Sequence, residues 1–116
     1  MKGSNLPITD TGVILFVKNY EKCVRFYSEK LGLPIRFQKP HLTNFDFGGS
    51  YLLIEKGKKK SGLKNGSLRL NVQNVAKTAK ILRGRGLKVN VWSADWGDIG
   101  QLRDPDGNPI ELCKWK

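Results

Sequence analysis

The segment Leu15-Phe16-Val17-Lys18-Asn19-Tyr20-Glu21-Lys22 decides the fold of this chain, because it occurs twice. A similar segment, Leu70-Asn71-Val72-Gln73-Asn74-Val75-Ala76-Lys77, lies 55 positions later. In each copy an apolar strand pattern leads into an asparagine, a residue that favours helix N-caps. Two copies of one module in a chain of 116 residues predict two packed sheets of like topology.

Each copy then continues through a helical pattern into a glycine, a leucine and a short strand. The first copy reads Gly32-Leu33-Pro34-Ile35-Arg36-Phe37, and the second reads Gly86-Leu87-Lys88-Val89-Asn90-Val91. Apolar alternation and turn residues predict strands at 10–18, 34–38, 42–47, 51–55, 67–72, 88–92, 99–103 and 110–115. The predicted order is β-α-β-β-β, twice. This is an α+β domain whose helices cover one face of each sheet.

The length of 116 residues corresponds to one domain. We expect an irregular N-terminal segment (1–9) and a single domain (10–116) that contains module one (10–55), a basic linker (56–66) and module two (67–116). A module of about 50–60 residues is only marginally stable alone. The two modules are therefore expected to share a core or to exchange with a second chain.

The net charge of +11, from 21 Lys and Arg against 10 Asp and Glu, favours anionic partners. Much of this charge lies in the linker, at Lys56, Lys58, Lys59, Lys60 and Lys64. A charge run in a linker is usually solvated. The alternative is nucleic-acid binding through this linker together with Arg83 and Arg85, although no recognition motif is visible.

Composition and the cysteines indicate the class of protein. Hydrophobic content of 39% and charged content of 27% are typical of a soluble globular protein, and no segment is apolar for long enough to be a signal peptide or a membrane span. Cys23 and Cys113 show no metal-binding or redox spacing, so we expect reduced thiols in a cytoplasmic protein without a membrane partner.

Two further segments resemble a known family. They are Val24-Arg25-Phe26-Tyr27-Ser28-Glu29-Lys30-Leu31-Gly32-Leu33, and Trp96-Gly97 followed by Arg103-Asp104-Pro105-Asp106-Gly107-Asn108-Pro109-Ile110-Glu111-Leu112. Over residues 10–115 the chain resembles the vicinal oxygen chelate superfamily, which holds glyoxalase I, extradiol dioxygenases, fosfomycin-resistance enzymes and bleomycin-resistance proteins. It is nearest the bleomycin-resistance branch. The resemblance implies two βαβββ half-barrels with helices outside, a homodimer with cavities between modules, and a role in antibiotic resistance.

The resemblance also implies four positions at which enzymes of the superfamily hold a metal ion, usually with His in the first strand of each module and Glu in the last. In this chain the four positions are Gly12, Leu53, Ser67 and Glu111. Glycine and leucine offer no metal donor. The single histidine, His41, is expected at a strand edge, and Glu55 replaces Leu53 only if the register is shifted by two. We therefore expect no metal, no cofactor and no catalytic residue.

The faces that would line the cavity are apolar and aromatic with a few polar groups, a composition that suits an organic molecule. The candidate ligand-binding residues are Phe16, Tyr51, Arg69, Asn71, Trp96 and Glu111. Arg69 is expected either to anchor the ligand or to pair with Glu111 across the sheet. By resemblance, Trp96 is expected to stack on a flat ring, whereas Trp92 and Trp115 are assigned to core or dimer packing.

Charge narrows the choice of ligand. Bleomycin is cationic, and a chain at +11 would repel it, so the expected ligand is an anionic or neutral aromatic compound. The leading hypothesis is a non-catalytic protein that binds or sequesters a small molecule. The alternatives are a metal-dependent lyase, transferase or dioxygenase, in which Glu111 would recruit Glu55 and His41, and a nucleic-acid-binding protein.

Overall fold

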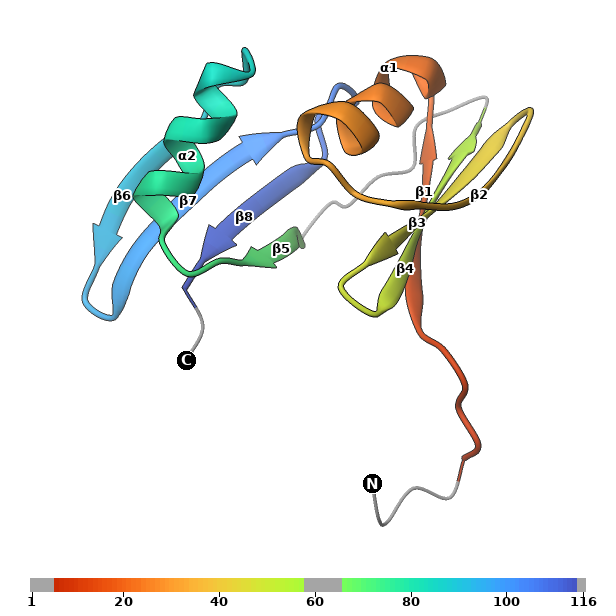
Figure 1. Ribbon diagram of the computed structural model, residues 1–116, viewed down its shortest axis with the longest axis horizontal. Helices are drawn as coiled ribbons and strands as arrows, with labels where there is room; N and C mark the ends of the chain where they lie inside the picture. The colour runs from red at the N-terminus through yellow and green to blue at the C-terminus, as the bar shows by residue number, and fades with distance from the viewer. Residues whose placement is uncertain (1–5, 58–65, 115–116) are drawn as a thin grey trace.

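The computed structural model describes residues 6–57 and 66–114, which form two four-stranded sheets with a helix over one face of each (Figure 1). The first module contains β1 (Gly12–Val17), α1 (Tyr20–Arg25), η1 (Phe26–Lys30), β2 (Ile35–Lys39), β3 (Leu42–Phe47) and β4 (Ser50–Lys56). The second contains β5 (Leu68–Asn71), α2 (Val75–Gly84), β6 (Asn90–Ala94), β7 (Gly97–Arg103) and β8 (Pro109–Cys113). The strand orders β1-β4-β3-β2 and β5-β8-β7-β6 confirm two copies of one βαβββ module.

The pairing register follows the internal repeat residue by residue. Ile14 lies beside Leu53 in the parallel pair β1–β4, and Arg69 lies beside Glu111 in the parallel pair β5–β8. Ile14 and Arg69 are 55 positions apart, and Leu53 and Glu111 are 58 apart, as are the turn glycines Gly49 and Gly107. Equivalent positions of the two modules therefore occupy equivalent places in the two sheets.

The helix of module one differs from the expectation at its start. Asn19 makes no side-chain cap; its Nδ2 donates to Oδ1 of Asp106 at 3.0 Å instead. Asn74 does cap its helix, because its Oδ1 accepts from the backbone N–H of Lys77 at 2.9 Å. Asp106 belongs to the other module, so the Asn19 side chain makes a tertiary hydrogen bond in place of the helix cap that the sequence predicts. At its other end α1 runs directly into the π-helical η1.

The β6–β7 connection was predicted wrongly. A polar stretch was expected between a strand at 88–92 and one at 99–103, whereas β6 and β7 form a hairpin with a two-residue turn at Asp95 and Trp96. Ser93 lies opposite Asp98, and its Oγ bonds to Oδ1 of Asp98 at 2.7 Å. Because the side chains at this end of the hairpin are polar and exposed, the sequence shows no apolar alternation there, although the β6–β7 pairing is regular.

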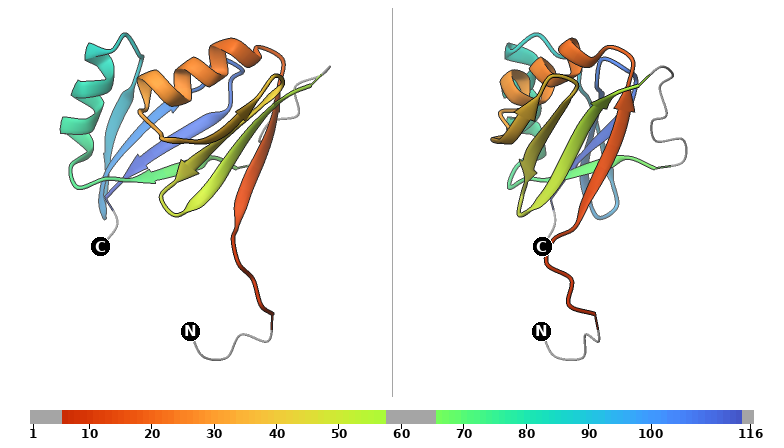
Figure 2. Two further views of the ribbon diagram at one scale, coloured as in Figure 1. Left: turned by 45° about the vertical axis from the view of Figure 1, so that its right-hand side comes forward. Right: turned by 90° about the vertical axis from the view of Figure 1, so that its right-hand side faces the viewer.

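A single hydrophobic core joins the two modules, as the marginal size of each predicted. Its fully buried members include Leu15, Val17, Tyr27, Phe45, Leu52, Ile54, Ile110 and Leu112. Figure 2 shows α1 and α2 near one another at one side of the two sheets, and residues 6–11 leading away from both sheets at the other side. No helix within residues 6–57 and 66–114 has the length and apolar character needed to cross a membrane.

A buried polar junction connects the β7–β8 turn to the backbone just before α1 and to η1. Asp106 Oδ2 accepts from the backbone N–H of Lys18 at 2.7 Å, and Asp104 Oδ2 accepts from the hydroxyl of Tyr27 at 2.7 Å. Both aspartates are buried. Burial, followed by the charge of Asp104, raises the pKa of Tyr27, so its hydroxyl stays protonated and donates. The junction fixes how the modules meet because a buried carboxylate is stable only when hydrogen-bonded.

The basic residues considered for nucleic-acid binding have other roles where the structure describes them. Arg83 Nε donates to the carbonyl of Val89 at 3.1 Å, and Arg85 Nη1 donates to the carbonyl of Lys30 at 2.7 Å. Lys56 was assigned to the linker but belongs to β4. The linker lysines at 58–60 and 64, and Trp115, lie outside the described residues.

The thiol of Cys23 is expected to react slowly in the folded protein. Cys23 is fully buried, and burial, with Asp104 and Asp106 nearby, raises the pKa of its thiol to about 12. At pH 8 a thiol with this pKa has a thiolate fraction about a thousandfold lower than an ordinary cysteine thiol. The more basic thiolate is a better nucleophile, which raises the rate by about twentyfold and offsets part of this loss. In a Cys113→Ser variant, with Cys23 as the single thiol, the rate with Ellman's reagent should be at least about fiftyfold lower folded than in urea. Equal rates would contradict the burial of Cys23.

Candidate functional site

Each sheet has one face that its helix leaves uncovered, called here its open face. Strand residues alternate between the two faces of a sheet, so the pairing register tells which residues lie on the open face. The first open face carries Gly12, Ile14, Phe16, Phe37, Tyr51 and Leu53, and the second carries Arg69, Asn71, Trp92, Ile99, Glu111 and Cys113. Several large apolar side chains on these faces are exposed in one chain: Ile14 at 46%, Phe16 at 40%, Phe37 at 46% and Trp92 at 45%. Apolar surface of this kind marks a site for a ligand or a partner.

The ring of Tyr51 occupies the place of a side chain at position 12. Gly12 and Tyr51 are register partners in β1 and β4. A Cβ added to Gly12 would overlap the Tyr51 ring carbons. No side chain can therefore stand at position 12 unless Tyr51 moves. The first open face presents an aromatic ring where the resemblance led us to look for a metal ligand.

Arg69 and Glu111 form an ion pair on the second open face. Arg69 Nε and Nη2 both donate to Oε1 of Glu111, at 3.2 and 2.8 Å. The hydrogen bond to Glu111 is the main cause that raises the pKa of the Arg69 guanidinium. Of the two roles considered for Arg69, the structure contains the ion pair, and ligand anchoring stays a prediction.

Cys113 lies next to this pair with its Sγ 3.7 Å from Oε1 of Glu111. It is fully buried, and burial raises the pKa of its thiol, although the charge of Arg69 acts in the opposite direction. A neutral thiol therefore adjoins the ion pair. Both cysteines are free, and Cys23 lies in the core away from this face.

The four implied metal positions do not fit a divalent ion. Gly12 is covered by Tyr51, and Leu53 has no donor atom. Ser67 is an exposed residue just before β5, and Glu111 is paired with Arg69. Glu55 pairs in register with Phe16, one step further along β4 from Leu53 on the same face, and His41 lies in the β2–β3 turn. Among residues 6–57 and 66–114 no three His, Cys, Asp or Glu side chains gather closely enough to hold a metal.

The six candidate ligand residues are divided between several places. Phe16 and Tyr51 lie on the first open face, and Arg69, Asn71 and Glu111 lie on the second, where Asn71 pairs with Cys113. Trp96, 60% exposed, lies in the β6–β7 turn and lines a hollow of about 470 Å³ together with Asn74 and Val75 at the start of α2.

Trp92 and Phe37 are open-face residues that the sequence reasoning did not select. Trp92, assigned there to packing, pairs with Ile99 on the second open face. Its cross-strand pairing with Ile99 would have placed it on this face, but that pairing follows only from the β6–β7 hairpin. Phe37 could not be placed, because the register shifts between Ile35 and Phe37, so strand alternation gives the wrong face.

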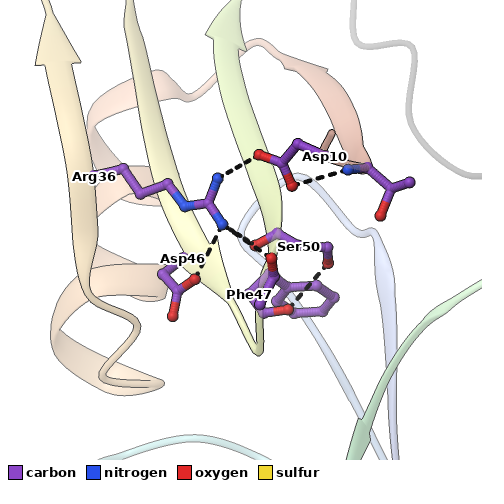
Figure 3. A network of polar contacts seen from close by, with 7 residues as sticks. Asp10, Arg36, Asp46, Phe47 and Ser50 are labelled. Atoms are coloured by element: carbon purple, nitrogen blue, oxygen red, sulfur yellow. Dashed lines mark hydrogen bonds and ion pairs between the residues drawn. The ribbon is translucent and has the colours of Figure 1, made fainter. Parts of the chain in front are cut away.

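Arg36 closes one end of the first open face (Figure 3). Its Nη1 donates to Asp10 Oδ2 at 2.7 Å, and its Nη2 lies 3.2 Å from Asp46 Oδ1 and 3.0 Å from the carbonyl of Ser50. β1 and β2 are at opposite edges of the sheet, so this side chain links the segment before β1 to β2. The hydrogen bond from Arg36 is the main cause that lowers the pKa of Asp10, so the ion pair persists to lower pH.

Known proteins share the sequence pattern and the fold of this chain. Residues 11–112 match the family described as the Glyoxalase/Bleomycin resistance protein/Dioxygenase superfamily. The uncharacterised protein YraH of Bacillus subtilis (strain 168) is 30% identical, with 86% of this chain and 93% of YraH covered. Lactoylglutathione lyase from Agrobacterium tumefaciens has a TM-score of 0.76 at 17% identity, covering 93% of this chain and 94% of that one. A Bacillus anthracis protein described as a glyoxalase family member has a TM-score of 0.80 at 18% identity, covering 98% and 100%.

Proposed function

Because the chain belongs to the Glyoxalase/Bleomycin resistance protein/Dioxygenase superfamily, we propose that it binds a small aromatic molecule, neutral or anionic, without converting it. The observation that carries this proposal is the composition of the open faces. They present aromatic and aliphatic side chains, the Arg69–Glu111 ion pair and a few scattered polar groups, where a metal-dependent member of the family would need several donors held together. Sequestration of a toxic compound is the role that such a protein would have.

In this proposal a second copy of the chain completes the cavity. The contacts between modules in one chain use the shared hydrophobic core and the junction at Asp104 and Asp106, and they leave large side chains of both open faces exposed. Within residues 6–57 and 66–114, none of five surface hollows with volumes of about 320 to 640 Å³ combines residues of both open faces. A homodimer that places the first open face of one copy against the second open face of the other would cover both.

The net charge supports the choice of ligand. A field of +11 repels cations and attracts anions at long range. Stacking on the first open face would favour a flat ring, and the exposed aromatic side chains there include Phe16 and Phe37.

A thermal-shift screen with neutral, anionic and cationic aromatic compounds tests the proposed function. At a concentration of 100 times its Kd a ligand stabilises the protein by about 2.7 kcal/mol, so a neutral or anionic hit should raise Tm by at least about 5 °C. The shift should shrink in Phe16→Ala and persist in Ile81→Ala, because Ile81 is at least as exposed, at 48%, but lies on α2. A screen with no hit, or stoichiometric binding of nickel or manganese with turnover of a substrate, would contradict the proposal.

A further inference from the structure

We propose that the Arg69 guanidinium is the built-in cation of this ligand site, in the place where a metal ion would be needed, and that it selects ligands carrying a carboxylate. This inference rests on the proposed function and narrows it to one class of ligand. It starts from the mismatch at the implied metal positions, where three residues offer no suitable donor set and the fourth, Glu111, already has a cation beside it.

The strand register fixes the position of Arg69 on the second open face. Arg69 and Glu111 are register partners on adjacent parallel strands, and both side chains project from the second open face. The equivalent pair in module one, Ile14 and Leu53, is apolar. The chain therefore carries a guanidinium paired with a carboxylate on the edge strand β5 of one open face, and an apolar counterpart on the other.

The hydrogen bonds leave one edge of the guanidinium available. A guanidinium has five N–H donors in a planar fork. Nε and Nη2 each use one donor on the same oxygen of Glu111, at 3.2 and 2.8 Å, so two N–H groups of Nη1 and one of Nη2 remain. A parallel pair of N–H groups at this free edge matches the two oxygens of a carboxylate. The Arg69 side chain is 43% exposed in one chain, so a ligand can reach it.

The two faces would then bind the two ends of one molecule. The carboxylate of the ligand would bind Arg69. The aromatic ring of the ligand would lie against the apolar first open face of the other copy, where the Tyr51 side chain covers Gly12. Glu111 keeps the guanidinium in place and balances its charge when no ligand is bound. Such a site needs no metal ion to attract an anion.

Calorimetric titration with 2-naphthoate and its neutral isostere 2-naphthamide, each with and without EDTA, tests this inference on the full chain. The wild type should bind naphthoate at least tenfold more tightly than naphthamide, with no effect of EDTA. Arg69→Gln should lose this preference while keeping its affinity for naphthamide within about threefold. Arg25→Gln is the matched control, because it removes the same charge from an exposed position on α1. It should leave the preference unchanged.

The outcomes separate this inference from the proposed function. Equal affinity for the two probes, a preference that survives Arg69→Gln, or loss of naphthoate binding in EDTA would overturn the role of Arg69 and leave aromatic binding intact. Absence of binding by both probes would overturn both proposals. Circular dichroism of Arg69→Gln should match that of the wild type, since Arg69 is exposed, and Arg69→Lys, which keeps the charge but not the fork, should retain only part of the preference.

Discussion

Asp104→Ala should destabilise the protein by about 3–5 kcal/mol, because it removes the acceptor at the centre of a buried network. Asp104 Oδ1 accepts from the backbone N–H groups of Asp106 and Asn108, at 2.9 and 2.8 Å. Its Oδ2 accepts from the hydroxyl of Tyr27 and from Nδ2 of Asn108, at 2.7 and 2.8 Å. Alanine would leave these donors buried without an acceptor, and each such group costs about 1–3 kcal/mol.

Urea denaturation at one fixed protein concentration measures this effect, because the stability of a dimer depends on concentration. Tyr27→Phe removes one of the four hydrogen bonds and should cost only about 1–2 kcal/mol. Asp95→Ala, at an exposed position in the β6–β7 turn, should change the stability by less than about 0.5 kcal/mol. If Asp104→Ala were as stable as Asp95→Ala, the junction would not hold the modules together.

Ile14→Asp should weaken the proposed homodimer at least about a hundredfold. Ile14 is at the middle of β1 on the first open face and is 46% exposed in one chain. A charge there would have to lose its water when the second copy covers the face, which is strongly unfavourable without a partner. Twofold symmetry places the substitution in the interface twice, so the loss of binding free energy is doubled.

Sedimentation velocity from micromolar to nanomolar concentration gives the dissociation constant. The matched control is Ile81→Asp, since Ile81 is 48% exposed but lies on α2, away from the open faces. This variant should keep the dimer, and both variants should melt cooperatively. A monomeric wild type, or equal constants for the two variants, would rule out the open faces as the dimer interface.

Where the chain repeats itself, the sequence predicted the fold well. The similarity of residues 15–22 to 70–77 indicated two like modules, and the pairing of Ile14 with Leu53 and of Arg69 with Glu111 confirms that alignment to the residue. Strand alternation, turn residues and helix boundaries are local, so they are visible in one dimension. The residue types at the implied metal positions could also be read without any structure.

The features that the sequence could not supply depend on contacts between distant segments. Asn19 fits a helix cap by every local rule, yet its side chain donates a hydrogen bond to Asp106, 87 positions away. The β6–β7 hairpin formed across polar residues, and the register shift in β2 turned Phe37 to the open face.

By itself, then, the sequence determined the two modules, their order and the chemistry available on each strand, because these follow from local periodicity. Only the tertiary structure decided that Tyr51 covers Gly12, that Arg69 leaves one edge of its guanidinium unused, and that the buried Asp104 joins the modules. These features depend on side-chain directions and on close approaches between elements that are far apart along the chain, and local sequence patterns carry no information about either.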